Sequence, residues 1–221
     1  MTSRRVFLGS AVAVGVGAAA AGNLSRPRPA SAGTDATVVA DGLAIIDCAA
    51  WGARAPRQPV PVLPHRPNKI IIHHTATANS PDTSRAHAIA LARDIQDLHM
   101  DRNGWRDTGQ HFTISRGGYV LEGRHGSLAY LRGGVRMVRG THCVGQNDQS
   151  IGIENEGTYL TVQPTAALWQ ALVVLCGYTC RRYRIPATEI YGHNDFNATL
   201  CPGLLHARLP LLRRMVATML A

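Results

Sequence analysis

The run Ile70-Ile71-Ile72 constrains the fold more than any other part of the chain. Three consecutive β-branched residues favour a strand that is buried on both faces, and such a strand lies inside a sheet covered by helices. The run ends at His73 and His74, where polar residues follow. A buried strand that ends in histidines therefore predicts an α/β domain with polar side chains at one edge of its sheet.

Patterns elsewhere in the chain support this class. Strands are expected in "HFTIS" and "YVLEG", which form a hairpin through Gly117-Gly118, and in "SIGIENEG" and "EIYGH". Apolar spacing predicts helices over 82–102, 164–184 and 203–220, the last interrupted by Pro210. The apolar face of the first helix is expected to contain Ile89, Ala92, Ile95 and Leu98. We expect a central, mostly mixed β-sheet flanked by about three helices.

The first 32 of the 221 residues look like an export signal. Arg4 and Arg5 form a twin arginine, an Ala/Val/Gly run follows over about 8–22, and small residues precede an expected cleavage after Ala32. The apolar run is too short and too weakly hydrophobic for a comfortable membrane span, although an uncleaved anchor is the alternative. The mature protein is predicted to be secreted, without stable membrane insertion.

After cleavage, residues 33–44 are expected to form a linker and residues 45–221 a single domain. The leader holds four arginines and no acidic residue, so its removal lowers the net charge from +9 to +5. This surplus suits an anionic partner such as a bacterial cell wall. No basic run is interleaved with aromatic residues, so nucleic acid is not an expected partner.

The chain has five cysteines, and an odd number leaves at least one thiol outside any disulfide. If Cys201 binds a metal, the other four can pair. A bond between Cys176 and Cys180, one helical turn apart, is awkward, so a link from Cys48 to one of them is expected. Buried reduced thiols are the alternative. Cys143 is the remaining cysteine of the five.

The segment "GHNDFNATLCPG" places His193 and Cys201 at the two ends of one loop. A catalytic zinc takes three protein ligands and leaves its fourth position open. His73 is the natural third ligand because a buried strand would hold it rigidly, whereas His74 points to the opposite face. Taken singly, each histidine could be a hydrogen-bonded core residue and "CPG" a turn or a disulfide end. Together they favour a metal site.

Five segments in order, "IIIHHTAT", "GWRDTGQHF", "VLEGR", "SIGIENEG" and "YGHNDFNATLCPG", resemble the zinc-dependent N-acetylmuramoyl-L-alanine amidases. That family shares its fold with the peptidoglycan recognition proteins, and the resemblance covers about residues 45–212. It implies one Zn²⁺ per chain, held by His73, His193 and Cys201. It also implies a monomer that hydrolyses the lactyl–L-alanine amide of peptidoglycan or of a muropeptide.

The resemblance also implies catalytic residues. Many members carry a tyrosine in "GYHF" near the zinc, but this chain has Gln110, which cannot act as an acid or base. "SIGIE" places Glu154 where one branch of the family has its catalytic glutamate, so Glu154 is expected to be the general base, with Glu156 as the alternative. Thr199 matches a position that steadies the oxyanion, where a hydroxyl contributes less than a lysine would.

Four residues are expected to contact substrate: Gln110, Arg124, His142 and Asn147. For His142, Asn147 and Arg124, a structural role is an equally open reading. Two other functions compete with hydrolysis. A recognition module of the same fold typically lacks the cysteine ligand, which this chain keeps. A structural zinc site usually has four protein ligands, and the sequence offers only three well-placed ones.

Overall fold

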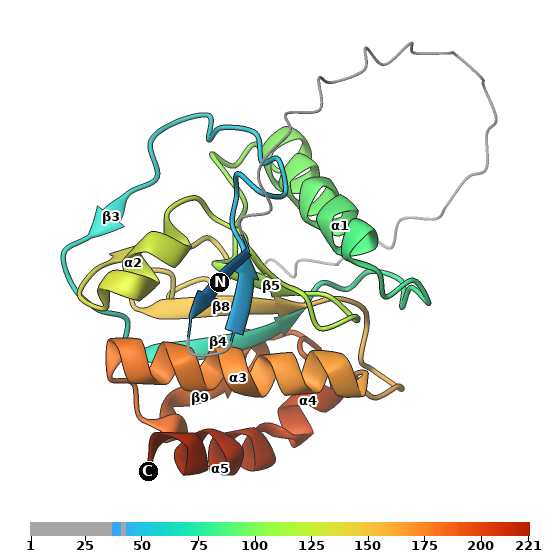
Figure 1. Ribbon diagram of the computed structural model, residues 1–221, viewed down its shortest axis with the longest axis vertical. Coiled ribbons are helices and arrows are strands. Elements are labelled where there is room, and N and C mark those ends of the chain that lie inside the picture. The colour runs from blue at the N-terminus through green and yellow to red at the C-terminus, as the bar shows by residue number, and fades with distance from the viewer. Residues whose placement is uncertain (1–36, 41–42) are drawn as a thin grey trace, which may run out of the picture. The chain divides into compact units, whose positions relative to one another are not determined.

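The computed structural model describes residues 37–40 and 43–221 (Figure 1). The predicted export signal, residues 1–32, lies outside the described residues. The strands are β1 (Thr37–Ala40), β2 (Leu43–Ile46), β3 (Val62–Leu63), β4 (Lys69–His74), β5 (Phe112–Ile114), β6 (Val120–Glu122), β7 (Met137–Val138), β8 (Ser150–Asn155) and β9 (Ile190–Gly192). The helices are α1 (Arg85–Asp97), α2 (Ser127–Gly133), α3 (Ala166–Tyr183), α4 (Leu204–Ala207) and α5 (Leu209–Leu220). Short turns are a π-helix, η1 (Leu98–Arg102), and the 3-10 helices η2 (Ala187–Glu189) and η3 (His193–Asp195).

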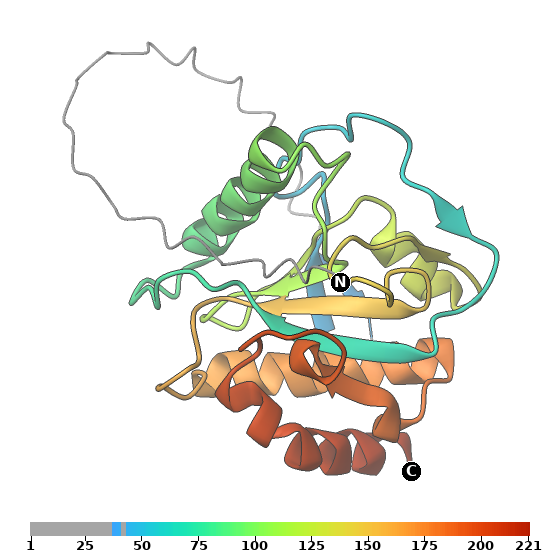
Figure 2. The same cartoon turned by 180° about the vertical axis from the view of Figure 1, so that it is seen from behind.

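A mixed seven-stranded sheet in the order β1-β2-β6-β5-β8-β4-β9 forms the centre of the domain. β1–β2 and β5–β6 are antiparallel pairs, and the remaining neighbours are parallel. β4 lies between β8 and β9, with Ile70, Ile71 and Ile72 fully buried. α3 and α5 cover one face of the sheet and α1 lies on the opposite side (Figures 1 and 2). The predicted α/β class with a mixed central sheet is confirmed.

Strand alternation decides which side chains can form a site. Ile70 and Ile72 of β4 and Ile151 and Ile153 of β8 belong to the core cluster that also contains α3 and α5 side chains. Because successive side chains point to opposite faces, the side chains of His73 and of its register partner Glu154 lie on the α1 side. The same alternation places Thr113 of β5, the partner of Glu154, on that side. Polar residues thus meet beside the carboxyl ends of the central parallel strands.

Several expected elements match the structure closely. The hairpin predicted around Gly117-Gly118 is β5–β6, and the long second helix is α3, capped by the hydroxyl of Thr165. The last helix divides into α4 and α5, with Pro210 in the first turn of α5, where the missing N–H does no harm. The sequence reading missed α2, which ends at the left-handed Gly134.

The predicted apolar face of the first helix is partly wrong. The buried residues of α1 include Ala88, Leu91, Ala92 and Ile95, whereas Ile89 is only half-buried. Leu98 is 43% exposed, although its N–H still donates to Asp94 O as in an α-helix. The wider turn of η1 begins there, and Asn103 N donates to Leu98 O. This change of period rotates the following side chains away from the phase that 3.6-residue spacing predicts.

Two other expectations need correction. Thr37–Ala40, inside the predicted linker 33–44, pairs antiparallel with β2 and forms an edge of the sheet. The predicted disulfide from Cys48 is wrong, since all five cysteines are free. Cys48 packs with Trp51 and Ala88, whereas Cys176 and Cys180 belong to the separate α3 core. They serve as small apolar side chains.

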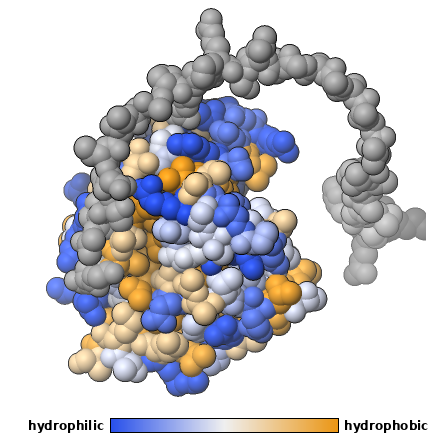
Figure 3. Space-filling view, turned by 45° about the vertical axis from the view of Figure 1, so that its right-hand side comes forward, coloured by the Kyte–Doolittle hydropathy of each residue, from blue (hydrophilic) through white to orange (hydrophobic). Residues whose placement is uncertain are grey.

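Among residues 37–40 and 43–221, no helix is long and apolar enough to cross a membrane. The face in Figure 3 mixes hydrophilic and hydrophobic side chains.

Two buried histidines away from the candidate ligands make stability depend on pH. His99 Nδ1 accepts from Gly109 N, and His111 Nδ1 accepts from Gly152 N. Burial is the main cause that lowers the pKa of each imidazole from 6.5 to about 4. The folded protein therefore keeps both rings neutral where the unfolded chain already binds protons.

We expect the free energy of unfolding to fall as pH decreases below 6.5 and to keep falling until about pH 4. Each histidine contributes about 1.4 kcal/mol per pH unit in this window. Urea unfolding at pH 7, 6 and 5, with a chelator present, measures the slope. His99→Asn keeps an acceptor for the N–H of Gly109 and should reduce the slope by the contribution of one histidine. The control His65→Asn, at an exposed position, should not change the slope. An equal slope in all three proteins would contradict the assignment.

Candidate metal centre

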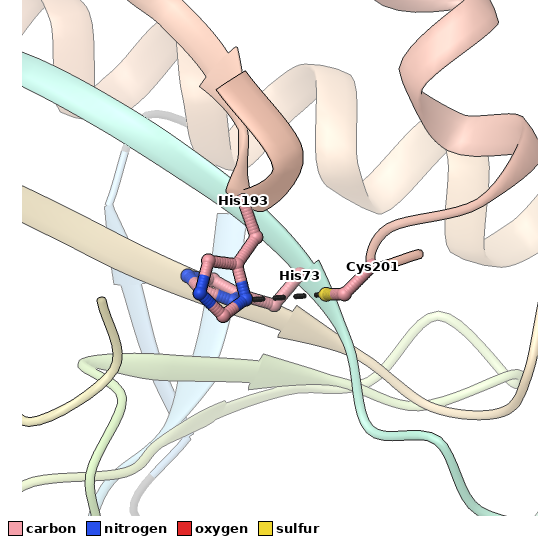
Figure 4. A group of neighbouring side chains, drawn as sticks. All are labelled: His73, His193 and Cys201. Atoms are coloured by element: carbon pink, nitrogen blue, oxygen red, sulfur yellow. Dashed lines mark hydrogen bonds between the residues drawn. The ribbon is translucent and has the colours of Figure 1, made fainter. Parts of the chain in front are cut away.

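Three side chains from two distant parts of the sequence meet at the carboxyl ends of β4 and β9. His73 lies near the end of β4, His193 begins η3 directly after β9, and Cys201 follows on the same loop (Figure 4). Their possible ligand atoms all lie within 4.8 Å of one another. β4 and β9 are parallel neighbours, so their carboxyl ends deliver the two histidines to the same place. His73 is buried, and the other two are half-buried.

Hydrogen bonds to Nε2 of His73 and His193 leave Nδ1 of both rings facing the point where the three side chains meet. His73 Nε2 is 3.0 Å from His142 Nδ1, and His193 Nε2 is 3.1 Å from Asn197 Oδ1. With Nε2 engaged, each ring presents Nδ1 as the remaining ligand atom. His73 Nδ1 is 3.8 Å from Cys201 Sγ, the contact dashed in Figure 4.

The donor set fits zinc. Two imidazole nitrogens and one thiol sulfur are ligands that zinc accepts, and a fourth position remains for solvent or substrate. Tetrahedral zinc with bonds of about 2.0–2.1 Å to nitrogen and about 2.3 Å to sulfur separates these two ligand atoms by about 3.6 Å. The 3.8 Å between His73 and Cys201 is close to this separation. Within the described part of the chain, this candidate group has three members and no fourth.

The protonation states of the two candidate histidine ligands are also compatible with metal binding. Burial, together with the neighbouring histidines His193, His74 and His111, holds the pKa of His73 well below its usual value. Burial also lowers the pKa of His193. Both rings are therefore neutral at pH 7, as ligation requires. Burial raises the pKa of Cys201 to about 12, although His74 N–H donates to its sulfur at 3.3 Å. Cys201 therefore needs a neighbouring cation to be a thiolate at neutral pH.

A directed chain of hydrogen bonds extends behind His73. If His73 Nδ1 faces the metal, its Nε2–H donates to His142 Nδ1, and His142 Nε2 then carries a proton toward Ser150 Oγ, 3.4 Å away. Ser150 in turn donates to Gln146 O at 2.7 Å. The ring of His142 lies over Gly152, where an added Cβ would come within 2.4 Å of it. The sheet therefore leaves room for this histidine only because position 152 is glycine.

The structure changes the reading of three predicted substrate contacts. Both ring nitrogens of His142 are engaged within the protein, so its contacts suit it for orienting His73. Asn147 Oδ1 accepts from His142 N and Cys143 N and shapes the loop that carries His142. Arg124 is 2% exposed and its guanidinium donates to three groups of the protein: Thr108 O, Arg139 O and Thr141 Oγ1. These contacts suit Arg124 to the structural role that the sequence left open.

Glu154 lies next to two of the candidate ligands, His73 and Cys201. It is the register partner of His73 on β8, and its charge raises the pKa of Cys201. Burial raises the pKa of Glu154 itself to about 7. The alternative base, Glu156, is buried and already bound, since it accepts from Arg116 N at 2.7 Å and lies 2.6 Å from His87 Nε2. Glu156 thus joins β8 to α1.

Two further residues complete the polar surroundings. Gln110 is buried; its Nε2 donates to Thr113 Oγ1 at 2.8 Å, and among the described residues its Oε1 has no hydrogen-bond partner. Thr199 Oγ1 accepts from Cys201 N at 3.2 Å, which leaves the hydroxyl proton as a donor. The sequence reading missed Asn197, although its place four residues after His193 was a usable signal.

Known proteins share this fold and site region. The family model of N-acetylmuramoyl-L-alanine amidase matches residues 63–204. The chain is 34% identical over 163 residues to peptidoglycan-recognition protein SC2 of Drosophila melanogaster, covering 73% of this chain and 82% of that protein. It is 32% identical over 157 residues to an N-acetylmuramoyl-L-alanine amidase of Homo sapiens, covering 69% of this chain and 25% of that protein.

A solved structure gives the same picture. A mutant of Drosophila PGRP-LB in complex with tracheal cytotoxin superposes with a TM-score of 0.61 at 29% identity. The match covers 72% of this chain and 88% of that one. The predicted fold family is confirmed.

Removing the hydrogen-bond partner of His73 should weaken metal binding. We expect His142→Ala to lower the affinity for Zn²⁺ by about 10–100-fold, because the ring of His73 then loses the group that orients it. Competition with a chelating dye measures the affinity, and circular dichroism checks the fold. Exposed His65→Ala is the matched control. Equal zinc affinities of the two variants would show that His142 does not support metal binding through His73.

Proposed function

Because the chain belongs to the N-acetylmuramoyl-L-alanine amidase and peptidoglycan-recognition protein family, we propose that it is a zinc-dependent amidase. Its reaction is hydrolysis of the amide bond between N-acetylmuramic acid and L-alanine in peptidoglycan. The observation that carries this proposal is the convergence of His73, His193 and Cys201 beside Glu154. A centre with three protein ligands and an adjacent carboxylate suits catalysis better than a closed structural site.

His73, His193 and Cys201 are the residues that would hold the metal. Zinc, when bound, supplies Lewis acidity toward a carbonyl and toward water. The Nε2 partners of the two histidines, His142 and Asn197, keep both rings aimed at one point, so little reorganisation accompanies binding.

Glu154 acts as the proton carrier in this proposal. Its carboxylate accepts a proton from the attacking water and then delivers it to the nitrogen of L-alanine as the C–N bond breaks. A pKa near 7 suits a group that must both take and return a proton. Thr199 donates its hydroxyl proton to the oxygen that becomes negative in the tetrahedral intermediate.

Peptidoglycan or a muropeptide is the proposed substrate. Support comes from the structural relative that is in complex with tracheal cytotoxin. The surplus of positive charge over residues 33–221 suits an anionic wall. We also propose that residues 1–32 direct export by the twin-arginine route, on the basis of Arg4, Arg5 and the following apolar run.

Turnover separates an amidase from a recognition module that only binds. The chain without residues 1–32 should release dye from labelled peptidoglycan, lose this activity with a chelator and regain it with Zn²⁺. Cys201→Ala should be inactive, whereas Cys176→Ala, a control in the α3 core, should keep its activity per folded molecule. Mass spectrometry should find free lactyl groups and new L-alanine amino termini. Binding without these products would identify a recognition module.

Glu154, which lies in β8, and Glu156, which directly follows it, should respond differently when the carboxylate is replaced by an amide. We expect Glu154→Gln to lower kcat by about 10²–10⁴-fold with normal zinc content, because proton transfer is lost. Glu156→Gln should mainly lower the melting temperature, since it weakens the contact with His87 on α1. Steady-state kinetics, metal analysis and thermal unfolding distinguish the two. A normal kcat in Glu154→Gln would assign the base elsewhere.

A further inference from the structure

A cavity lies at the free edge of the sheet, beside β9. It has a volume of about 440 Å³ and lies where β9 meets α4 and α5, elements that adjoin one another in Figure 2. Its lining includes two aromatic rings, Tyr191 and Phe196, and three polar side chains, Asp195, His206 and Arg213. Tyr191 and Asp195 are each two residues from His193, so the cavity adjoins the centre along the chain.

The aromatic rings form a fixed apolar surface. Tyr191 and Phe196 pack edge to face with their centroids 5.2 Å apart. The hydroxyl of Tyr191 donates to Glu189 Oε2 at 3.1 Å, and Lys69 Nζ lies 5.4 Å from the centre of the Phe196 ring. Arg213 Cζ lies 5.5 Å from the centre of the Tyr191 ring, on one of its faces, and both rings are half-buried, so each keeps part of its surface open to solvent.

The polar side chains are held in place by the edge strand itself. Arg213 donates through Nε and one terminal nitrogen to Ile190 O, and Asp195 Oδ2 accepts from Gly192 N at 2.8 Å. Asp195 Oδ1 lies 2.8 Å from His206 Nε2. These contacts use only part of each group: the second terminal nitrogen of Arg213, Nδ1 of His206 and further lone pairs of Asp195 remain for a ligand.

Flat apolar rings next to preoriented donors and acceptors match the chemistry of a pyranose. A sugar ring has one apolar face of C–H groups and a rim of hydroxyls that both donate and accept. Such a ligand places its C–H face on an aromatic ring and its hydroxyls against carboxylate, imidazole and guanidinium groups. Preorganisation of these groups reduces the ordering cost of binding.

We propose that this cavity binds a sugar of the glycan strand, next to the muramic acid whose amide is cut. The inference rests on the proposed function for its substrate, since the glycan strand of peptidoglycan continues beyond the muramic acid. The site would let the protein hold polymeric wall material while His73, His193 and Cys201 face the amide.

Titration with chitotetraose, an N-acetylglucosamine oligomer without peptide, tests the site directly. Binding should be measurable by NMR with both the zinc-loaded and the chelator-treated protein, because the cavity does not include the metal. Phe196→Leu, which keeps apolar bulk but removes the ring, and His206→Ala should each weaken binding about tenfold. Tyr130→Leu on α2, far from the cavity, is the matched control and should bind normally.

Kinetics provide the second measurement. For polymeric peptidoglycan, His206→Ala should lower kcat/KM about tenfold through KM, and the decrease should be smaller for a muramoyl peptide with no neighbouring sugar. The absence of chitotetraose binding would overturn the glycan site. Binding that both variants leave intact would overturn its location, and competition by a free stem peptide would assign the cavity to a carboxylate. Loss of amidase activity with retained binding would refute only the proposed function.

Discussion

Parallel pairing of β4 with β8 on one side and β9 on the other is the constraint on which the candidate site depends. The register places His73 opposite Glu154, and the end of β9 delivers His193 to the same edge. A slip of one residue would turn each of these side chains to the opposite face. The apolar core on the α3 face opposes such a slip, because the slip would turn the polar side chains of His73 and Glu154 into that core. The core therefore sets the geometry of the polar site.

Hydrogen bonds convert this position into an orientation. His142 and Asn197 each engage the Nε2 atom of one candidate ligand, so both Nδ1 atoms face a common point. The support for His142 continues through Ser150 to a backbone carbonyl and needs glycine at position 152. Metal affinity in this protein should thus depend on residues that touch no metal.

Local patterns in the sequence predicted five of the strands in the described residues (β4, β5, β6, β8 and β9), the hairpin, α3 and the divided C-terminal helix, because those elements follow from burial and turn chemistry. The sequence could also group His73, His193 and Cys201, since a family motif records their long-range contact. It could not show that Arg124 is buried, because its three partners come from separate segments. The π-turn after α1 and the edge strand β1 were missed for a related reason: tertiary packing, and not local propensity, selects them.

The replacement of a tyrosine by Gln110, inferred from the resemblance, has a chemical consequence within the proposed reaction. Gln110 uses its NH₂ group on Thr113 and presents an oxygen that can only accept a hydrogen bond. A phenol could donate to a developing oxyanion, but this oxygen cannot. Donation then falls to the hydroxyl of Thr199, and proton transfer falls to Glu154 alone. Burial holds the pKa of Glu154 near 7, where the carboxyl group can serve in both directions. A single tuned carboxylate can therefore carry the acid–base chemistry that other arrangements divide between two side chains.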